Sequence, residues 1–474
     1  EITDDSWIRD LNNSGKVVFS DTGKILTVNG NYIGNSGVLN IKTILEDDNS
    51  ITDKLHVKGN TSGETLVNIE KAGGNGAATD EGIRIIEVEG NSAGNFSLAA
   101  PVQAGIYEYN LYKGGVTTPN DGDWYLRSYY YEAPKEPEKP VDPEKPEESK
   151  EPEKVIPPPI NSQEPVITYR PGISNYVSGQ KANAEQGMLQ LSTYHQRMGR
   201  QEKEYAEDKQ MWIRAYGSHQ HNDGKKRFDY EQTITGMQFG MDLYNNVNSK
   251  STTDRAGLIL DYSYANARFF DDLRSEKNTG RMHAQSTAFG GYYTKITNDS
   301  AYFDIVGIVG LLNNGFKDSY GEKSAQDGWR TGISLETGYP FVSNSGWGLE
   351  PQLQLAYQHT HYSSFSDSYS DIEGYNADML RGRGGFRVFK DIGNNGSQLY
   401  GVANIIHDFT DFKDLKIDGT SIGEEYDKSY GEAGVGFNLK TTEKSSIYGD
   451  MRYQKSFGGN MDNATFSIGF KKEF

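Results

Sequence analysis

The sequence predicts an all-β protein: a closed transmembrane β-barrel of twelve strands with one α-helix lodged in its pore, preceded by a β-solenoid. Three observations lead to this prediction. Residues 211–474 alternate apolar and polar side chains through nearly every strand. No run approaches the ~20 apolar residues of a membrane-spanning helix, so any membrane insertion must be by strands. A single polar helical segment comes directly before the first strand.

The alternation is clearest in residues 329–341. Trp329, Ile333 and Leu335 fall on one side, while Arg330 and Glu336 fall on the other. Strands of this kind, repeated without helices between them, are typical of a barrel whose outside contacts lipid and whose inside is wet. A soluble sheet can alternate in the same way, but it needs continuous apolar runs for a buried core, and the segment has few.

Strand boundaries follow from this period of two. An even strand number places both barrel ends on the same side of the membrane. Four connections are tight (297–298, 345–346, 392–396 and 441–443), whereas four are long and polar (269–280, 314–326, 362–375 and 411–423), so we expect the tight set in the periplasm. The predicted strands are 211–221, 228–246, 254–268, 281–296, 299–313, 327–344, 347–361, 376–391, 397–410, 424–440, 444–457 and 463–474.

Composition restricts the possible partners and compartments. The net charge is −18 and no basic stripe is present, which argues against nucleic acid. The 31 tyrosines and 54 glycines suit interfacial aromatic girdles and close-packed barrel walls. Without cysteine, no disulfide can lock the chain before it crosses a membrane. The first residues lack the basic end and apolar centre of a signal peptide, so we expect a mature fragment of a longer precursor.

Residues 1–131 have a different rhythm. Short β-rich pieces at 24–28, 55–57, 66–69 and 83–88 are separated by turns rich in Gly and Asn. This pattern predicts solenoid rungs, each burying its apolar face against its neighbours, with residues 106–131 as a cap. A compact β-sandwich is the alternative.

Residues 132–173 form the predicted linker. Eleven of the 15 prolines lie between positions 134 and 171, mixed with Glu and Lys. Such a segment cannot pack and is expected to act as an extended, semi-rigid spacer. A proline-rich ligand for a partner domain is the alternative, which the repeated charges disfavour.

A helix is predicted at residues 174–208, directly before the barrel at 209–474. At 1.5 Å per residue it would reach about 45 to 50 Å, enough to cross an outer membrane, yet it is too polar to touch lipid. We therefore expect it inside the barrel lumen, with everything before it outside the cell. Its narrow apolar stripe consists of Ala184, Met188, Leu191, Tyr194 and Met198.

Two further motifs support a family resemblance. Residues 53–63 (DKLHVKGNTSG) are similar to an autochaperone pattern, and the last strand, 463–474, is similar to the terminal signal read by the outer-membrane barrel assembly machinery. Together with the pore helix, they make the chain resemble the C-terminal part of a monomeric (type Va) autotransporter of the AIDA-I adhesin type. The residues of the resembling assembly signal are Phe466, Ile468, Phe470 and Phe474.

The resemblance implies an outer-membrane translocator in a Gram-negative bacterium. It would export its own N-terminal passenger, here the end of a right-handed β-helix, and anchor it at the cell surface, where an adhesin would serve virulence by contacting a host surface or another copy of itself. The implied partners are outer-membrane lipid and lipopolysaccharide, the barrel assembly machinery and periplasmic chaperones. Two competing functions remain: a solute channel with an accessory β domain, and a soluble solenoid that binds or cleaves polysaccharide.

The alternation along each predicted strand places charged residues of both signs on the side that faces the pore. We expect these side chains to contact water, each other and the helix, without a catalytic role. The predicted pore-lining residues are Asp261, Arg330, Glu336, Glu350, Arg381, Arg383, Arg387, Glu432, Asp450 and Arg452.

Passenger self-cleavage is a weaker possibility. Some members of the resembling family cut at an Asn-Asn pair in the pore helix, but here Asn183 is followed by Ala184. Other members use carboxylates near the junction, although such acids usually form a solvated helix face. The candidates of that kind are Glu185, Glu202, Glu204, Glu207 and Asp208.

Metal and cofactor sites are not expected. His219 with His221, and His359 with His361, are i,i+2 pairs that could share a metal, but no converging carboxylate set accompanies them. Polar residues near the outer rim are the simpler interpretation. The sequence also lacks a Gly-x-Ser-x-Gly motif, a phosphate loop and a dinucleotide fingerprint.

Overall fold

The computed structural model describes residues 1–131, 165–200, 208–248, 252–393 and 396–474. These residues form two compact units, Glu1–Arg170 and Pro171–Phe474. Most of the predicted linker, residues 132–164, lies outside the described residues. Its described end corrects the predicted boundary, because β14 (Val166–Ile167) pairs with β13 (Tyr129–Tyr130) and belongs to the first unit.

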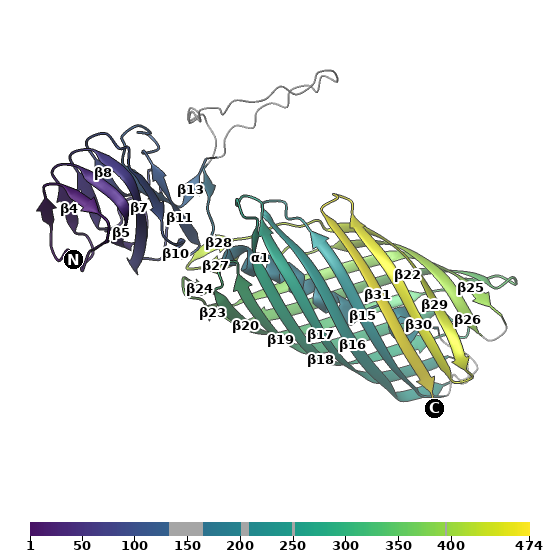
Figure 1. Ribbon diagram of the computed structural model, residues 1–474. Helices are drawn as coiled ribbons and strands as arrows, with labels where there is room; N and C mark the ends of the chain where they lie inside the picture. The colour runs from purple at the N-terminus through teal and green to yellow at the C-terminus, as the bar shows by residue number, and fades with distance from the viewer. Residues whose placement is uncertain (132–164, 201–207, 249–251, 394–395) are drawn as a thin grey trace, which may run out of the picture. The chain divides into compact units, whose positions relative to one another are not determined.

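The first unit is built from two parallel sheets. One contains β1 (Ser6–Ile8), β4 (Ile25–Val28), β6 (Lys54–Val57) and β8 (Ile83–Val88). The other contains β2 (Leu11–Asn13), β3 (Lys16–Val18), β5 (Tyr32–Ile44), β7 (Thr61–Gly73) and β9 (Asn95–Leu98). Successive turns of the chain therefore stack as rungs, as Figure 1 shows, and Leu26, Leu55 and Ile86 align in the core.

A repeated turn, not predicted from the sequence, links the two strands of each rung: β4 to β5, β6 to β7 and β8 to β9. The pattern V-x-G-N-x-x-G begins at Val28, Val57 and Val88. Its asparagines form a ladder: the Asn60 amide donates to Oδ1 of Asn31 at 2.9 Å, and the Asn91 amide donates to Oδ1 of Asn60 at 2.8 Å. Each ladder bond satisfies a turn amide that would otherwise lack a protein partner.

Antiparallel strands end the parallel stack. β8 pairs with β12 (Trp124–Arg127), which pairs with β11 (Tyr107–Lys113) and then β10 (Val102–Ala104). Tyr109 fastens this end to the rungs, since its hydroxyl contacts the carbonyls of Glu46 and Ala77 at 2.9 and 3.1 Å and accepts from the Ala77 amide at 2.9 Å.

The second unit is a closed barrel. Among the described residues it has twelve long antiparallel strands, and the first and last of them pair from Gln210↔Glu473 to Asn222↔Met461. This confirms the predicted strand number. The strands are β15 (Gln210–Asn222), β16 (Phe228–Val247), β17 (Thr253–Asp271), β18 (Asn278–Ile296), β19 (Tyr302–Asp318), β20 (Lys323–Gly338), β22 (Trp347–Tyr362), β25 (Tyr375–Ile392), β26 (Ser397–Asp408), β29 (Ser429–Thr442), β30 (Ser445–Ser456) and β31 (Met461–Glu473).

Several predicted boundaries were wrong. The strand expected at 327–344 ends at Gly338, because Pro340 cannot donate to the ladder, and the two-residue β21 (Phe341–Val342) follows. The loops expected at 269–280 and 314–326 are largely strand, since β17 to β20 extend into them. The other two long loops contribute a small four-stranded sheet of β23 (Phe365–Ser366), β24 (Asp371–Ile372), β27 (Leu415–Ile417) and β28 (Thr420–Ile422).

Large aromatic side chains inside the barrel lie against glycines of neighbouring strands. A Cβ atom added at Gly240 would come within 2.2 Å of the Trp212 ring, and one added at Gly236 within 2.3 Å of the Tyr216 ring. The glycines leave room for the rings to lie flat on the inner wall, which tightens the packing around the lumen.

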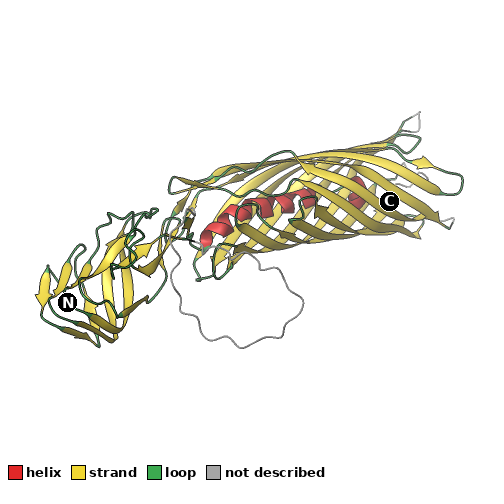
Figure 2. Ribbon diagram, turned by 90° about the horizontal axis from the view of Figure 1, so that it is seen from above, coloured by secondary structure: helices red, strands yellow, loops and turns green. Residues whose placement is uncertain are grey.

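The predicted continuous helix at 174–208 is also corrected. The structure has α1 (Gly172–Leu191), a break, and the short α2 (Tyr194–Met198), while residues 201–207 lie outside the described residues. Ser192 takes a φ of 33°, Thr193 starts a new capping box with Gln196, and Gly199 ends α2. Figure 2 shows both helices enclosed by the barrel strands. None of the described helices is both long and apolar enough to span a membrane.

Candidate functional site

The lumen of the barrel is the candidate site, and the helix occupies it off-centre. α1 packs on β16 to β20 and β22. Its apolar stripe is buried there: Met188 and Leu191 belong to one cluster with Ile259, Val306 and Ile308 of the inner wall. The pore wall is therefore not uniformly polar, because it carries an apolar patch that matches the stripe of the helix.

A four-residue ion cluster joins α1 to the wall. Lys181 Nζ lies 2.7 Å from Glu185 and 3.1 Å from Asp408. Arg381 contacts both carboxylates, with hydrogen bonds of 2.8 and 3.0 Å to Glu185 and 2.6 Å to Asp408. Two cations thus face two carboxylates with almost no solvent exposure, which is the arrangement that a buried charge requires.

Wall side chains also bind the helix backbone. Arg330 donates to the Asn183 carbonyl at 2.6 Å, and Gln358 donates to the Ala184 carbonyl at 2.9 Å. Gly187 allows this approach, since a Cβ atom there would lie 2.0 Å from Gln358 Oε1 and 2.7 Å from Arg330 Cζ. Further donors from the wall to helix carbonyls are Gln232, Gln238, Arg214 and Gln354.

The segment after the break is held mainly by carboxylates. Glu336 accepts from the amide of Tyr194 at 2.9 Å, so its carboxylate lies at the buried N-terminus of α2, where the free amides favour an anion. His195 lies 2.6 Å from Glu350, and Arg197 pairs with Asp304 at 2.6 Å. Together with the α1 contacts, these pairs fix the inserted polypeptide along most of the lumen.

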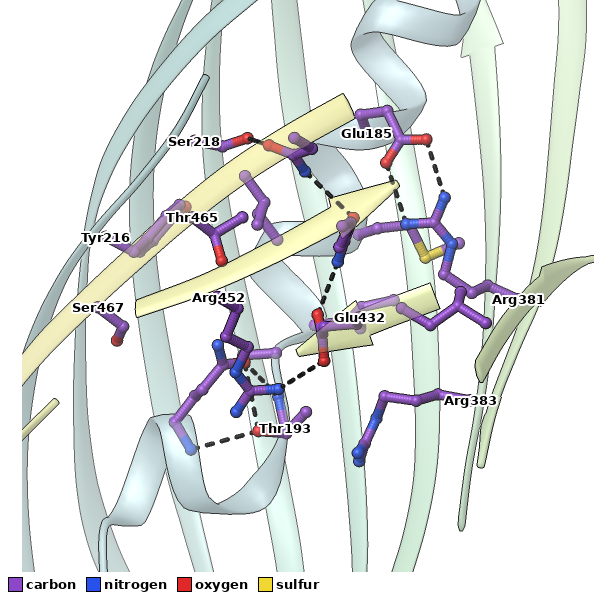
Figure 3. Close-up of a pocket in the computed structure, with 18 of the residues that line it drawn as sticks. Glu185, Thr193, Tyr216, Ser218, Arg381, Arg383, Glu432, Arg452, Thr465 and Ser467 are labelled. Carbon is purple, nitrogen blue, oxygen red and sulfur yellow. Dashed lines mark hydrogen bonds and ion pairs between the residues drawn. The ribbon is translucent and has the colours of Figure 1, made fainter. Parts of the chain in front are cut away.

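A polar cavity remains on the other side of the lumen. Its volume is about 90 Å³, and it lies between the helix break and β15, β25 and β29 to β31. Figure 3 shows Glu185 and Arg381 pointing toward one another at its edge, while Arg452 reaches toward Glu432 of the wall at 3.2 Å. The cavity is large and polar enough for ordered water.

The ten residues predicted to line the pore all lie on lumen-facing positions of their strands, but they do two different things. The first group contacts the helical segment, and the second bonds to other wall residues. The first group is Asp261, Arg330, Glu336, Glu350, Arg381 and Asp450; the second is Arg383, Arg387, Glu432 and Arg452.

Sequence reasoning missed several members of the site. Asp408 and Asp304 have the same lumen-facing parity as their neighbours in the predicted strands, so the parity argument could have included them. Lys181 and Arg197 had no such signal, because a polar helix shows no single face that identifies its charged contacts. Arg214 was also missed, and it donates to the Leu189 carbonyl at 3.1 Å.

The structure does not bring the described candidate acids for self-cleavage together. Glu185 is held between Lys181 and Arg381, and Asp208 pairs with Lys444 at 2.6 Å. Glu202, Glu204 and Glu207 lie outside the described residues.

The two histidine pairs face outward on β15 and β22, which lie on opposite sides of the barrel. In the described part of the chain, no group of three His, Asp or Glu side chains could hold a metal ion.

The terminal strand β31 presents its apolar face to the outside. Phe466, Ile468, Phe470 and Phe474 are 49%, 50%, 40% and 52% exposed, as residues that contact lipid would be. The sequence prediction that these residues form an assembly signal stays a prediction.

Comparison with known proteins identifies both units. The family model for the autotransporter beta-domain matches residues 211–452, and the model for the autochaperone domain type 1 matches residues 6–111. The adhesin BmaC autotransporter of Brucella suis is 29% identical over 94% of this chain, which spans 13% of that protein. The uncharacterised protein YdeU of Escherichia coli is 30% identical, with 93% of this chain and 96% of that protein covered.

A solved structure agrees with the fold. The transport unit of the autotransporter AIDA-I from Escherichia coli superposes with a TM-score of 0.55 at 18% identity, covering 65% of this chain and all of that unit. The barrel is therefore the translocator domain in the outer membrane, and the N-terminal unit is on the cell surface. The chain belongs to the autotransporter family.

Proposed function

We propose that the barrel is the route by which the N-terminal unit leaves the cell, and that the structure represents the state after export. The observation that carries this proposal is the path of the chain: α1 and α2 run through a closed lumen, so the residues before Gly172 leave at one end and β15 begins after the segment has reached the other. A solute channel needs no covalent segment threaded through its pore.

In this proposal the helical segment becomes a plug once export is complete. The ion cluster of Lys181, Glu185, Arg381 and Asp408 and the donors to helix carbonyls hold it in the lumen. The polar cavity beside the helix break holds only about 90 Å³, so the inserted segment leaves little free volume at that level of the lumen. Anchoring then needs no further component, because the surface unit stays joined to the barrel through the plug.

The N-terminal unit would act as a folding template for passenger residues upstream of it. Its parallel sheets end at β1 and β2, whose outer edges can accept a further rung, while β10 to β12 close the other end. Adding a rung buries apolar surface and completes another turn, so folding outside the cell can draw the chain outward without ATP.

The partners follow from this pathway. We propose that periplasmic chaperones hold the unfolded chain, that the barrel assembly machinery reads the apolar face of β31, and that the passenger is an adhesin contacting a host surface or another copy of itself. The adhesin assignment is supported by the name of the BmaC relative, of which this chain spans only 13%.

Surface accessibility tests export. The full chain would carry an epitope tag before Glu1 and an export signal, and intact cells would be treated with protease. We expect loss of the tag and the N-terminal unit, with the barrel left protected. A tag that stays protected in intact cells, beside a folded barrel, would overturn the proposal.

Conductance distinguishes the translocator from a solute channel. In planar bilayers the full chain should conduct poorly, and deletion of residues 174–200 should open a large, steady pore. As a matched control, deletion of residues 419–421, at the exposed tip of the β27–β28 hairpin, leaves the lumen untouched and should leave conductance low. High conductance of the intact chain would favour the solute channel instead.

A further inference from the structure

Four cationic side chains form a row on the outside of the barrel. Arg268 on β17 lies opposite Arg281 on β18, Arg281 lies opposite Lys317 on β19, and Lys317 lies opposite Lys323 on β20. These four strands are neighbours in the wall (Figure 1), and the alternation of each strand places the four side chains outward. Like charges directly opposite each other destabilise a sheet, so the row is unfavourable without an anion.

The row is poorly neutralised by the protein. Arg268, whose side chain is 70% exposed, has a carboxylate of Glu231 at 3.8 Å, near the limit of an ion pair. Within the described ranges, Arg281, Lys317 and Lys323 make no ion pair.

Nearby carboxylates are already occupied by other groups. Asp318 Oδ1 accepts from the amides of Tyr320 and Glu322 at 2.9 and 2.8 Å, and Glu322 Oε1 accepts from the Ser368 hydroxyl at 2.7 Å. The row therefore keeps most of its positive charge available to an external ligand.

The row lies at the outer end of the barrel. Thr279, two residues before Arg281, hydrogen-bonds to Ser174 in the first turn of α1. Because the chain before α1 is on the cell surface, this end faces the cell exterior. The continuation of the row onto β16, β15, β31 and β30 alternates in charge through Glu231, His221, Asp462 and Lys455, so the unbroken positive segment is confined to β17 to β20.

The height of the row above the lipid can be derived from the strands. Leu311 and Trp329 are the outermost large apolar residues facing lipid on β19 and β20, and each lies six residues from the cation of its strand. Six residues span roughly 20 Å along a strand, which a tilt of about 40° reduces to roughly 15 Å of height. The row thus stands just above the headgroup layer, which is about 5 to 8 Å thick.

We propose that Arg268, Arg281, Lys317 and Lys323 form a binding site for the phosphate groups on the inner sugars of lipopolysaccharide. This glycolipid fills the outer leaflet, and its phosphorylated sugars extend above the headgroup layer to the height of the row. Neighbouring strands are about 4.8 Å apart, so one phosphate can contact cations of two strands, with the arginines binding in a bidentate manner. The site would fix lipopolysaccharide against one side of the wall and would not depend on passenger export.

The test uses the full chain purified in detergent and titrated with lipopolysaccharide whose inner sugars are phosphorylated. Three further probes are the same glycolipid after removal of these phosphates, lipid A alone and inorganic phosphate. The test variant is R281Q/K317Q/K323Q, which also removes like-charge repulsion and should fold. The matched control is K295Q/K390Q/K472Q, with the same change of charge on outward positions at the opposite end of the barrel.

We expect the wild type to bind the phosphorylated glycolipid roughly tenfold more tightly than the dephosphorylated one, given several exposed charge-assisted contacts. The test variant should lose this preference, the control should keep it, and rising salt should weaken it. Equal binding by test variant and wild type would overturn the site. Equal affinity for lipid A alone, or for inorganic phosphate alone, would also overturn the assignment to inner-sugar phosphates. Surface display of the same variants is measured in parallel and should be unchanged, so failure of this site is distinguishable from failure of export.

Discussion

Arg381 of β25 bridges the plug and the wall: its guanidinium binds Glu185 of α1 through bonds of 2.8 and 3.0 Å and Asp408 of β26 through bonds of 2.6 and 2.9 Å. Removing one partner of a buried ionic group leaves the others uncompensated, which costs about 3 to 5 kcal/mol. The contact therefore couples the position of the helix to the integrity of the barrel wall.

The first prediction concerns this bridge. In Arg381→Gln, Glu185 keeps only Lys181 as a cationic partner, so α1 should leave its position more often. We expect frequent openings in planar bilayer recordings and faster proteolysis of the plug. Arg452→Gln is the matched control, since among the described residues Arg452 pairs with the wall carboxylates of Asp450 and Glu432 and makes no ion pair with α1. Equal opening in both variants would show that the bridge does not hold the plug.

The second prediction concerns the close approach at Gly187. In Gly187→Val, the new side chain should displace Gln358 and Arg330 from the helix carbonyls that they bind, at a cost of about 2 kcal/mol for two lost hydrogen bonds. Raised conductance with an unchanged barrel mobility on gels would report this loosening.

Gly179→Ala is the control for that variant. Its nearest neighbour would be Phe316 at 3.3 Å, and alanine is the better helix former by about 1 kcal/mol. This variant should stay closed. If Gly187→Val also stayed closed, the donors to the helix backbone would be shown to be dispensable for plugging.

The strand number and the inward-facing residues of the barrel could be predicted because they depend on alternation between residues that are close in the sequence. Alternation with a period of two determines which side of each strand meets lipid, so the strand number and the inward parity of residues such as Glu336 followed without tertiary information. The ends of strands were less predictable. β19 continues to Asp318 and β20 begins at Lys323, so the two strands form a hairpin that extends above the membrane. Polar side chains occupy both faces of this hairpin, and the alternation of apolar and polar residues is lost there.

The helix break shows what pattern reading missed. Thr193 and Gln196 have the spacing of a capping box, and Gly199 marks a helix end, so the signals for α2 were present in the sequence. The apolar stripe continued across the break and suggested one helix. In contrast, the pairing of Lys181 with Asp408 joins residues 227 positions apart and leaves no local signal.

The third prediction concerns Tyr109 in the N-terminal unit. Its hydroxyl bonds to the Ala77 backbone and to the Glu46 carbonyl, so Tyr109→Phe should leave buried polar groups unsatisfied and lower the free energy of unfolding by about 1 to 3 kcal/mol. Pulse proteolysis of the full chain in urea would measure this loss. Because the unit is proposed to template passenger folding, surface display of an upstream tag should also slow.

Tyr112→Phe provides the comparison for Tyr109→Phe. The Tyr112 ring lies 5.3 Å from the Arg127 guanidinium, and its hydroxyl makes no hydrogen bond in the part of the chain that the structure describes. Its stability should change by less than about 0.5 kcal/mol, as for a surface substitution. Normal display by a destabilised Tyr109→Phe would separate the stability of the unit from its proposed role in export.

The fourth prediction uses Asp53, which is fully buried between rungs and accepts from the amides of Lys24 and Lys42 at 3.0 and 2.7 Å. Burial raises the pKa of its carboxyl above the ordinary value, against the opposing effect of these hydrogen bonds. The folded unit therefore binds the proton more tightly than the unfolded chain. Its contribution to stability is present below the unfolded pKa of about 3.9 and is lost as pH rises through the folded pKa.

The measurement is the difference in free energy of unfolding between wild type and Asp53→Asn, followed from pH 7 to pH 4 by pulse proteolysis. This difference should shift in favour of the wild type on acidification, because only the wild type gains the proton. Asp4→Asn is the control of opposite sign: a hydrogen bond from Lys24 lowers the pKa of the exposed Asp4, so its difference should shift against the wild type when the series is continued below the ordinary pKa of about 3.9. A parallel response of both variants would contradict burial as the cause of the Asp53 shift.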